Sequence, residues 1–175
     1  MHRSPDEFAL VFDVGGTHLR AAVYAHPERE LFGLQTRLTP NFLRFANESA
    51  DQIRRRLLAE MESMGRELFG DVAPRTVAVS FAGPLDAQQR VMAAPTIWGE
   101  RQEAPVDLLS DLCELWPEAN LVLENDVSAA GYRFMRSAED DLCVVTVSSG
   151  IGNKVFIGGR PKVGPAGRGG EIGLI

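Results

Sequence analysis

A carboxylate, two glycines and a hydroxyl follow directly after an apolar stretch near the start of the chain. The segment is Asp13-Val14-Gly15-Gly16-Thr17, and residues 8–12 precede it. An apolar strand would fix the carboxylate, the glycines would let backbone N–H groups approach phosphate oxygens, and Thr17 would add a hydroxyl donor. The pattern indicates a site for a metal-bound phosphate. A second apolar stretch, 19–24, resumes at once, so a plain hairpin turn stays open as the alternative.

Three further polar or glycine-containing segments come where predicted strands end. Gly83-Pro84 follows residues 76–82, Asn125-Asp126 follows 120–124, and Ser149-Gly150-Ile151-Gly152 follows 142–147. Ligands of α/β proteins gather beyond the carboxyl ends of the strands, so we expect these segments to converge on one cleft.

Phosphoryl transfer is the chemistry that such a cleft would support. Asp13 would orient Mg²⁺ through water, and Asp126 would accept the proton of an attacking hydroxyl. The Gly-Lys-Ser/Thr signature of a P-loop does not follow Gly16. Each segment also has a simpler interpretation, because Asn125-Asp126 could be a helix N-cap and the glycine segments could be turns or a hairpin.

The spacing of apolar residues predicts the elements that would position these groups. Residues 8–12, 19–24 and 30–38 are expected to form an antiparallel three-stranded meander. Residues 49–69 are expected to form a helix, with Ser49 and Gln52 as a capping box and Gly70 as its end. Its core-facing positions would be Ile53, Leu57, Met61, Met64 and Leu68.

The rest of the chain is expected to alternate strands and helices, with parallel strand pairing. Strands are predicted over 76–82, 120–124, 142–147 and 155–157. One helix is predicted over 106–116, with Val106, Leu109, Leu112 and Trp116 on one side. A second helix is predicted from 125 to about 137, and residues 94–99 are predicted to be a loop.

Composition excludes several classes of function. The net charge is −6 and the pI is about 5.1, and no dense basic cluster occurs beyond Arg54-Arg55-Arg56. We therefore expect no nucleic-acid partner. No apolar run approaches the roughly 20 residues that span a bilayer, and no signal peptide precedes Asp6 and Glu7, so a cytoplasmic protein without a membrane partner is predicted. Cys113 and Cys143 are expected to be buried free thiols.

The ordered motifs resemble those of the ROK family (repressor, open reading frame, kinase) of the sugar-kinase, heat-shock and actin superfamily. The similarity runs from residue 8 to the end. It comprises the phosphate motif 12–22, the Gly-Pro turn 82–86, the catalytic motif 124–130, the second phosphate motif 148–154 and the closing Gly-Glu-x-Gly motif 170–174.

The resemblance implies a fold, an activity and a set of site residues. The fold would be α/β, a ribonuclease-H-like (actin-like ATPase) lobe whose mixed sheet is flanked by helices, plus the start of a second similar lobe. The activity would be ATP- and Mg²⁺-dependent phosphorylation of a sugar or polyol hydroxyl, with a homodimer left open. Asp126 would be the base, and Asp13 would serve Mg²⁺. ATP phosphates would contact Gly15, Gly16, Thr17, Ser149, Gly150 and Gly152, and substrate would contact Gly83, Asn125, Asp126 and Glu171.

Some positions depart from the family pattern. Ser148 and Ser149 replace Gly and Thr, and Asn153 and Lys154 replace two glycines. Leu174 stands where the family places a sugar-binding histidine that is often also a zinc ligand, and leucine can bind neither a hydroxyl nor a metal. A cyclitol or modified sugar thereby becomes a credible substrate, and no zinc site is expected within this chain.

The resemblance also predicts the domain organisation. Residues 1–137 would form the N-terminal lobe and 138–175 the beginning of a C-terminal lobe, with the family's zinc loop and adenosine-binding segment beyond Ile175. We expect a chain of this extent to be inactive by itself. A ROK-type sugar-binding transcriptional regulator is the alternative function, although only 12 residues precede Asp13. A non-catalytic binding module is the third hypothesis.

Overall fold

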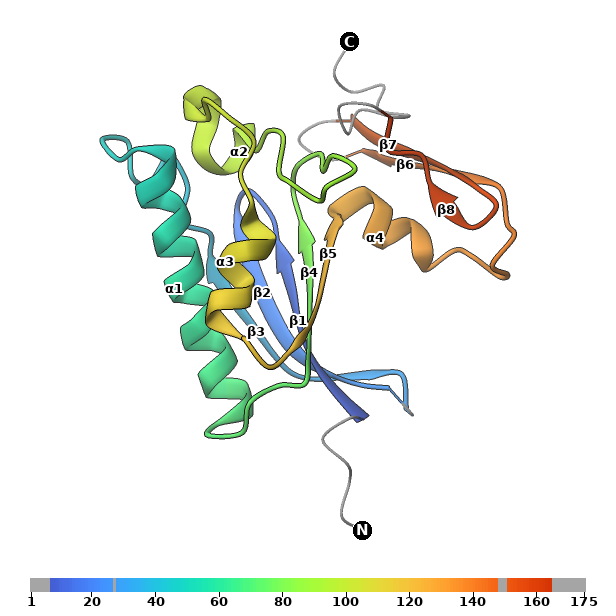
Figure 1. Cartoon of the computed structure of the whole chain (residues 1–175), viewed down its shortest axis with the longest axis horizontal. Helices are drawn as coiled ribbons and strands as arrows, with labels where there is room; N and C mark the ends of the chain where they lie inside the picture. Colours follow the sequence, from blue (N-terminus) through green and yellow to red (C-terminus); the bar gives the residue numbers. More distant parts are fainter. Residues whose placement is uncertain (1–6, 27, 148–150, 165–175) are drawn as a thin grey trace.

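The computed structural model describes residues 7–26, 28–147 and 151–164 of the 175-residue chain. Its larger unit is a five-stranded sheet in the order β3-β2-β1-β4-β5 (Figure 1). These strands are β1 Phe8–Val14, β2 His18–Ala25, β3 Glu30–Leu38, β4 Thr76–Phe81 and β5 Asn120–Asn125. A three-stranded antiparallel sheet contains β6 Leu142–Val147, β7 Ile151–Ile157 and β8 Arg160–Pro161.

Strand direction in the larger sheet follows the lengths of the connections. Short turns join β1, β2 and β3, which pair antiparallel and confirm the predicted meander. β1 pairs with β4 and β4 with β5 in parallel, after helical crossovers. The carboxyl ends of β1, β4 and β5 therefore meet at one edge of the sheet, as the sequence predicted.

Helix α1, Ala50–Phe69, confirms the prediction for residues 49–69. Ser49 and Gln52 form the capping box, and Gly70 ends the helix with a φ of 62°, which glycine adopts without steric cost. Four of the five predicted core positions, Ile53 to Met64, are fully buried, while Leu68 is partly buried.

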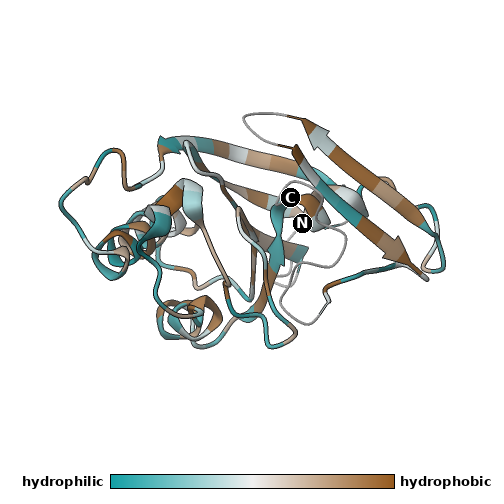
Figure 2. Cartoon of the chain, turned by 90° about the horizontal axis from the view of Figure 1, so that it is seen from above, coloured by the Kyte–Doolittle hydropathy of each residue, from teal (hydrophilic) through white to brown (hydrophobic). Residues whose placement is uncertain are grey.

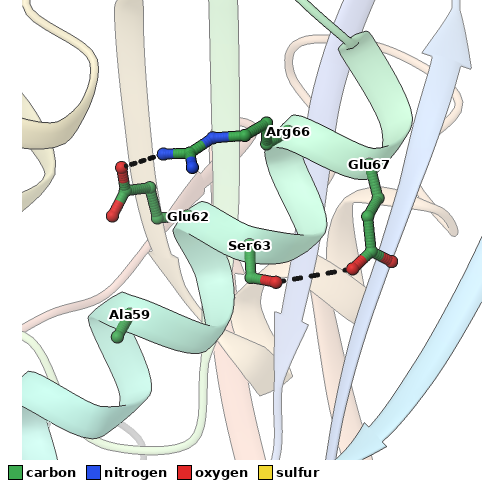
Figure 3. A pocket seen from close by; sticks show the side chains of 5 residues that line it. All are labelled: Ala59, Glu62, Ser63, Arg66 and Glu67. Atoms are coloured by element: carbon green, nitrogen blue, oxygen red, sulfur yellow. Dashed lines mark hydrogen bonds and ion pairs between the residues drawn. The ribbon is translucent and has the colours of Figure 1, made fainter.

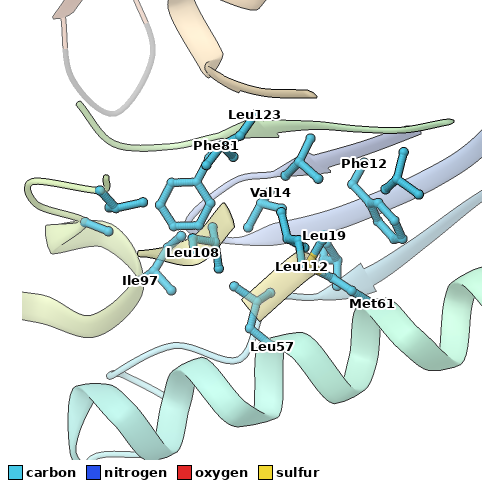
Figure 4. Close-up of a cluster of buried hydrophobic side chains, with 14 of the residues drawn as sticks. Phe12, Val14, Leu19, Leu57, Met61, Phe81, Ile97, Leu108, Leu112 and Leu123 are labelled. Atoms are coloured by element: carbon cyan, nitrogen blue, oxygen red, sulfur yellow. The ribbon is translucent and has the colours of Figure 1, made fainter. Parts of the chain in front are cut away.

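The main core lies between one face of the five-stranded sheet and the helices α1 and α3 (Figure 4). Alternate residues of β1, namely Leu10, Phe12 and Val14, point to this face because side chains alternate along a strand. Leu57 and Met61 of α1 pack on them. The polar residues between them, such as Asp13, consequently lie on the opposite face.

Helix α3, Leu108–Leu115, is shorter than the predicted 106–116 because Asp107 caps it, accepting a hydrogen bond from the N–H of Ser110. The predicted side of the helix is confirmed, since Leu112 and Trp116 are buried and Val106 and Leu109 pack against the core. Leu108 is also buried and extends this side. Cys113 then lies on the exposed side of the helix. Cys143 of β6 alternates with the buried Val144 and is exposed as well. The prediction of buried thiols is therefore wrong, although both thiols are free.

Residues 94–99, predicted to be a loop, contain a helical turn. Helix α2, Pro95–Trp98, starts with proline at its first turn and continues into the 3₁₀ turn η2, Gly99–Arg101. Ile97 and Trp98 are almost completely buried, and the Trp98 ring packs on Phe81 with centroids 5.5 Å apart. The proline and glycine in this segment had predicted an irregular loop. Burial of the Ile97 and Trp98 side chains stabilises a helical turn instead.

Helix α4, Asp126–Tyr132, connects the two sheets and is shorter than the predicted 125–137. After Tyr132 the helical pattern changes, because the N–H groups of Phe134 and Met135 donate to carbonyls three residues back instead of four. The carboxylate of Asp140 then accepts hydrogen bonds from the N–H groups of Arg136 and Ser137 and from the Ser137 hydroxyl. The strands of the small sheet are largely hydrophobic (Figure 2). Their Val144 and Phe156 side chains are buried, and Phe156 packs on Tyr132 of α4.

Candidate active site

Strand register places the predicted metal residue Asp13 at one level of the sheet with three other polar residues. Asp13 of β1 pairs with Ser80 of β4, which pairs with Glu124 of β5, and on the other side Asp13 pairs with Arg20 of β2. The Arg20 guanidinium donates to Asp13 at 2.8 Å, and the Ser80 hydroxyl lies 3.4 Å from the other carboxylate oxygen. The predicted metal residue Asp13 is thus part of a cross-strand polar row.

The turn Gly15–Thr17 is tight, and side chains from residues 39–41 hold its carbonyl groups. The N–H of Gly15 donates to the carbonyl of His18 at 3.0 Å, which closes the turn between β1 and β2. The Thr39 hydroxyl donates to the Gly15 carbonyl at 2.7 Å, and the Asn41 amide donates to the Gly16 carbonyl at 2.8 Å. Sequence reasoning missed Thr39 and Asn41, because nothing local indicates that residues 24 or 25 positions later meet the turn.

Gly16 also lies against α2. A Cβ at position 16 would stand 2.5 Å from the Cβ of Thr96 and 2.9 Å from its hydroxyl, which is too close for any side chain. The turn therefore needs glycine here for close packing. This requirement is separate from the approach of a phosphate and applies equally to the hairpin interpretation.

The Gly83-Pro84 turn follows β4 at the same edge. The N–H of Ala82 donates to the Val14 carbonyl at 2.9 Å, so the end of β4 stays attached to the end of β1. A Cβ on Gly83 would overlap the backbone carbonyl of Ala93. Gly83 thereby lets residues 85–93 fold back over the end of the strand, and Met92 donates to the Pro84 carbonyl at 2.9 Å.

Asn125 fastens this turn to the start of α4. Its side-chain oxygen accepts hydrogen bonds from the N–H groups of Val127 and Ser128, both at 3.1 Å, so Asn125 is the N-cap of the helix. Its amide donates to the Gly83 carbonyl at 3.0 Å and to Asp126 Oδ1 at 2.9 Å. The simpler interpretation as an N-cap is correct locally, and the same residue also joins two predicted parts of the site.

Asp126 is the first residue of α4 and is half-buried. Its Oδ1 accepts from the Asn125 amide and from the N–H of Val127, each at 2.9 Å. These two donors fix the carboxylate at the N-terminal end of the helix. A fixed carboxylate beside the carboxyl ends of the strands is suitably placed to accept a proton from a bound hydroxyl.

Glu124 and Lys154 bring charge to the interior next to Asn125. Burial raises the pKa of the Glu124 carboxyl, and the N–H of Asn125, the Ser128 hydroxyl and the Lys154 ammonium partly offset this. Lys154 of β7 is 3% exposed. A position that is glycine in the family pattern thus places a cation near the strand that leads into Asp126.

Gly152 lies against the start of α4. A Cβ at this position would stand 2.7 Å from the Thr146 hydroxyl and 2.9 Å from Cγ2 of Val127, the neighbour of Asp126. The part of the second phosphate motif that the structure describes belongs to β7, which is longer than the predicted strand 155–157. Ser149, Gly150 and Glu171, and also Leu174, lie outside the described residues.

A separate hollow lies on the outer side of α1 and takes no part in this site. It is lined by Ala59, Glu62, Ser63, Arg66 and Glu67 (Figure 3). Its charges are paired, because Arg66 lies 2.6 Å from Glu62 and Glu67 forms an ion pair with Arg37 of β3. Its position on the far side of the core from Asp13 gives it no connection with the strand ends.

The part of the chain that the structure describes offers no cluster of metal ligands around Asp13. Within residues 7–26, 28–147 and 151–164, no group of three or more His, Cys, Asp or Glu could hold a metal ion. Asp13 would therefore act together with phosphate oxygens and water, which is how Mg²⁺ is usually bound beside nucleotides.

In the same described part of the chain, no helix is long and apolar enough to cross a membrane.

Two curated kinases are similar to this chain in sequence. A C(7)-cyclitol 7-kinase of Streptomyces hygroscopicus subsp. limoneus is 35% identical over 170 residues, covering 94% of this chain and 47% of the kinase. A 2-epi-5-epi-valiolone 7-kinase of an Actinoplanes species is 32% identical over 184 residues, covering all of this chain and 48% of the kinase. The chain therefore spans about half the length of these relatives.

The fold also matches solved structures. A ROK family glucokinase of Streptomyces griseus, in complex with glucose and AMPPNP, superposes with a TM-score of 0.63 at 25% identity, covering 95% of this chain and 48% of the glucokinase. The expected α/β lobe is thereby confirmed. The sequence model of the ROK family matches residues 9–175. This chain belongs to the ROK family.

Proposed function

We propose that this chain is part of an ATP-dependent kinase that phosphorylates a hydroxyl group of a sugar or sugar-like polyol. The observation that carries the proposal is the convergence of the Gly15–Thr17 turn, Gly83 and Asp126 at one edge of the sheet. The Asn125–Gly83 hydrogen bond joins two of these parts directly. Kinase relatives that share the chain's whole extent support the same activity.

In the proposed reaction, Asp126 accepts the proton of the substrate hydroxyl. The hydroxyl oxygen attacks the γ-phosphorus of ATP, a new P–O bond forms, and the bond from that phosphorus to the bridging oxygen of ADP breaks. The products are the phosphorylated alcohol, ADP and one proton, which leaves from Asp126. Positioning and charge neutralisation supply most of the rate in such transfers, so one carboxylate base suffices on the substrate side.

The phosphates of ATP would lie against Gly15, Gly16 and Thr17 on one side and the segment from Ser149 to Gly152 on the other. The backbone of the first turn fits an anion, because the N–H groups of Gly16 and Thr17 donate to no acceptor in the described part of the chain. Asp13 would hold Mg²⁺, which when bound offsets negative charge on the phosphates.

The substrate would lie beside Asn125, Gly83 and Glu171, and we propose a cyclitol as its class. Two relatives named as cyclitol or valiolone kinases support this choice. Leu174 supports it further, since leucine removes the hydroxyl- and metal-binding capacity of the family's histidine.

We also propose the domain division into residues 1–137 and 138–175, which is supported by the separate sheets on either side of that boundary.

The test measures ADP release by the complete gene product that contains this chain, with ATP and Mg²⁺. The acceptor panel contains C7-cyclitols, glucose, mannose and N-acetylmannosamine at equal concentrations. We expect turnover with a cyclitol and at least tenfold lower kcat/KM for each hexose. Turnover with hexoses alone would contradict the cyclitol proposal, and no turnover with any acceptor from folded protein would contradict the kinase proposal.

A further inference from the structure

Two adjacent backbone donors in the Gly15–Thr17 turn point away from the protein's own acceptors. The N–H groups of Gly16 and Thr17 make no hydrogen bond to any of the residues that the structure describes. Gly16 is only partly exposed. Thr17 is exposed, so both N–H groups are accessible to a bound ligand. Successive backbone N–H groups form concave anion-binding sites.

The carbonyl groups of the same two peptide units are held on the other side. The Gly15 carbonyl accepts from the Thr39 hydroxyl, and the Gly16 carbonyl accepts from the Asn41 amide. A trans peptide is planar, with its C=O and N–H pointing in opposite directions, and the described backbone contains no cis peptide bond. Fixing each carbonyl toward residues 39–41 therefore aims the N–H of the following residue to the opposite side.

We propose that Thr39 and Asn41 are positioning residues that orient the N–H groups of Gly16 and Thr17 toward the nucleotide phosphates. This inference rests on the proposed kinase function and assigns it two residues outside the phosphate motif. Neither touches the phosphates. They act through the peptide planes of the turn, which glycine would otherwise leave free to rotate.

The surroundings of both side chains match such a role. Thr39 is completely buried and Asn41 is 7% exposed, so both side chains are almost entirely shielded from bulk water. Thr39 also donates its backbone N–H to the Thr17 carbonyl at 3.0 Å. Asn41 uses its oxygen to accept from the N–H of Arg44 at 3.0 Å, which fixes the orientation of its amide. Three consecutive carbonyls of the turn are thereby held by one segment.

The test compares nucleotide binding by the complete gene product and four variants, one of them a control, using isothermal titration calorimetry. The probes are AMPPNP with Mg²⁺, which carries phosphates, and adenosine, which carries none. Thr39→Val keeps the side-chain shape but removes the donor, and Asn41→Leu removes the other donor. Thr39→Ser retains the hydroxyl and serves as the rescue variant.

We expect Thr39→Val and Asn41→Leu to weaken AMPPNP binding about tenfold each, the size of one lost buried hydrogen bond, with adenosine affinity changed less than twofold. Thr39→Ser should bind AMPPNP as the wild type does. Thr36→Val, the same change at an exposed position of β3, is the matched control and should change neither affinity. A merely structural role would lower both affinities together.

The experiment distinguishes an error in the positioning role of Thr39 and Asn41 from an error in the proposed kinase function. If the wild type binds AMPPNP but both variants bind it equally well, the positioning role is wrong and the kinase proposal stands. Equal losses for AMPPNP and adenosine would also overturn the role. If folded wild type binds neither probe, the proposed function fails and the inference fails with it. Should Thr39→Val not fold, Asn41→Leu and Thr39→Ser decide the question.

Discussion

Asn125 donates a hydrogen bond from its side-chain amide to the carbonyl oxygen of Gly83, with the two atoms 3.0 Å apart. One residue thereby ties the turn after β4 to the helix that begins with Asp126. The same side chain caps α4 through Val127 and Ser128. The position of Asp126 therefore depends on a residue with both a donor and an acceptor.

Two substitutions at position 125 should separate these contributions. Serine is as good an N-cap as asparagine but too short to reach Gly83, so Asn125→Ser should lower the free energy of unfolding by about 1 kcal/mol. Asn125→Ala also removes the cap and should cost about 1 kcal/mol more. Denaturant unfolding measures both. Asp107→Ser, a cap-preserving change on α3, is the control, and equal stability of Asn125→Ser and wild type would contradict the role of the Gly83 bond.

Gly16→Ala should destabilise the protein because the new methyl group would collide with Thr96. The Cβ would lie 2.5 Å from the Cβ of Thr96, and overpacking of this kind costs about 1–3 kcal/mol. Thr96→Gly removes the colliding atoms, so the double variant should lose less stability than the two single changes together. Additive losses in a double-mutant cycle by chemical denaturation would show that this contact is not the cause.

Arg20→Gln should make Mg²⁺ bind more tightly if Asp13 serves the metal. The guanidinium lies 2.8 Å from the Asp13 carboxylate and competes with a metal for it. Both side chains are nearly half exposed, at 45% and 47%, so the pair is worth little. We expect the Mg²⁺ concentration for half-maximal ADP release to fall about 2–5-fold.

Arg55→Gln is the control for that measurement, since Arg55 forms a similar exposed ion pair with Asp51 on α1. It should leave the Mg²⁺ dependence unchanged. A higher Mg²⁺ requirement in Arg20→Gln would instead mean that Arg20 supports the site, and the competition argument would be wrong.

Asp86, in the turn beyond Gly83, should contribute stability that acid removes. Hydrogen bonds from the backbone N–H and guanidinium of Arg90 hold the pKa of its carboxyl below the usual value of 3.8, against the opposing effect of burial. A depressed pKa in the folded state means that the contribution is present above pH 3.8 and is lost as pH falls through the folded-state pKa.

Asp86→Asn should therefore be less stable than wild type at pH 7, with a difference that shrinks toward pH 3. Urea unfolding across this range measures it, and Asp71→Asn on the exposed turn after α1 is the matched control. A difference that is constant with pH would show that the charge of Asp86 does not matter.

Local patterns were sufficient to predict much of the fold. The meander and α1 follow from apolar periodicity, and the Ser49–Gln52 capping box marks the start of the helix. Parallel pairing places Val14, Phe81 and Asn125 at one level, so Asp13 and Asp126 lie near the same edge of the sheet. These features depend on neighbours in sequence and on general rules of strand connection.

The remaining features depend on contacts between distant residues. Thr39 and Asn41 show no sign in sequence that they hold Gly15 and Gly16, and Trp98 stabilises the helical turn α2 only by packing on Phe81. After α4, Asp140 binds the N–H groups of Arg136 and Ser137, a contact that helical periodicity does not reveal. Cys113 is exposed although it follows the buried Leu112, because the core contacts of α3 leave Cys113 on the solvent side.

The central claim is that Asp126 acts as a general base, and the most direct test is ADP release by Asp126→Asn in the complete gene product. We expect kcat to fall by about 10²–10⁴-fold, the usual contribution of such a base, while AMPPNP binding changes less than twofold. Asp107→Asn makes the same chemical change at the start of α3 and should leave kcat unaltered. Turnover by Asp126→Asn within a few-fold of wild type would contradict the assignment of the base and the mechanism built on it.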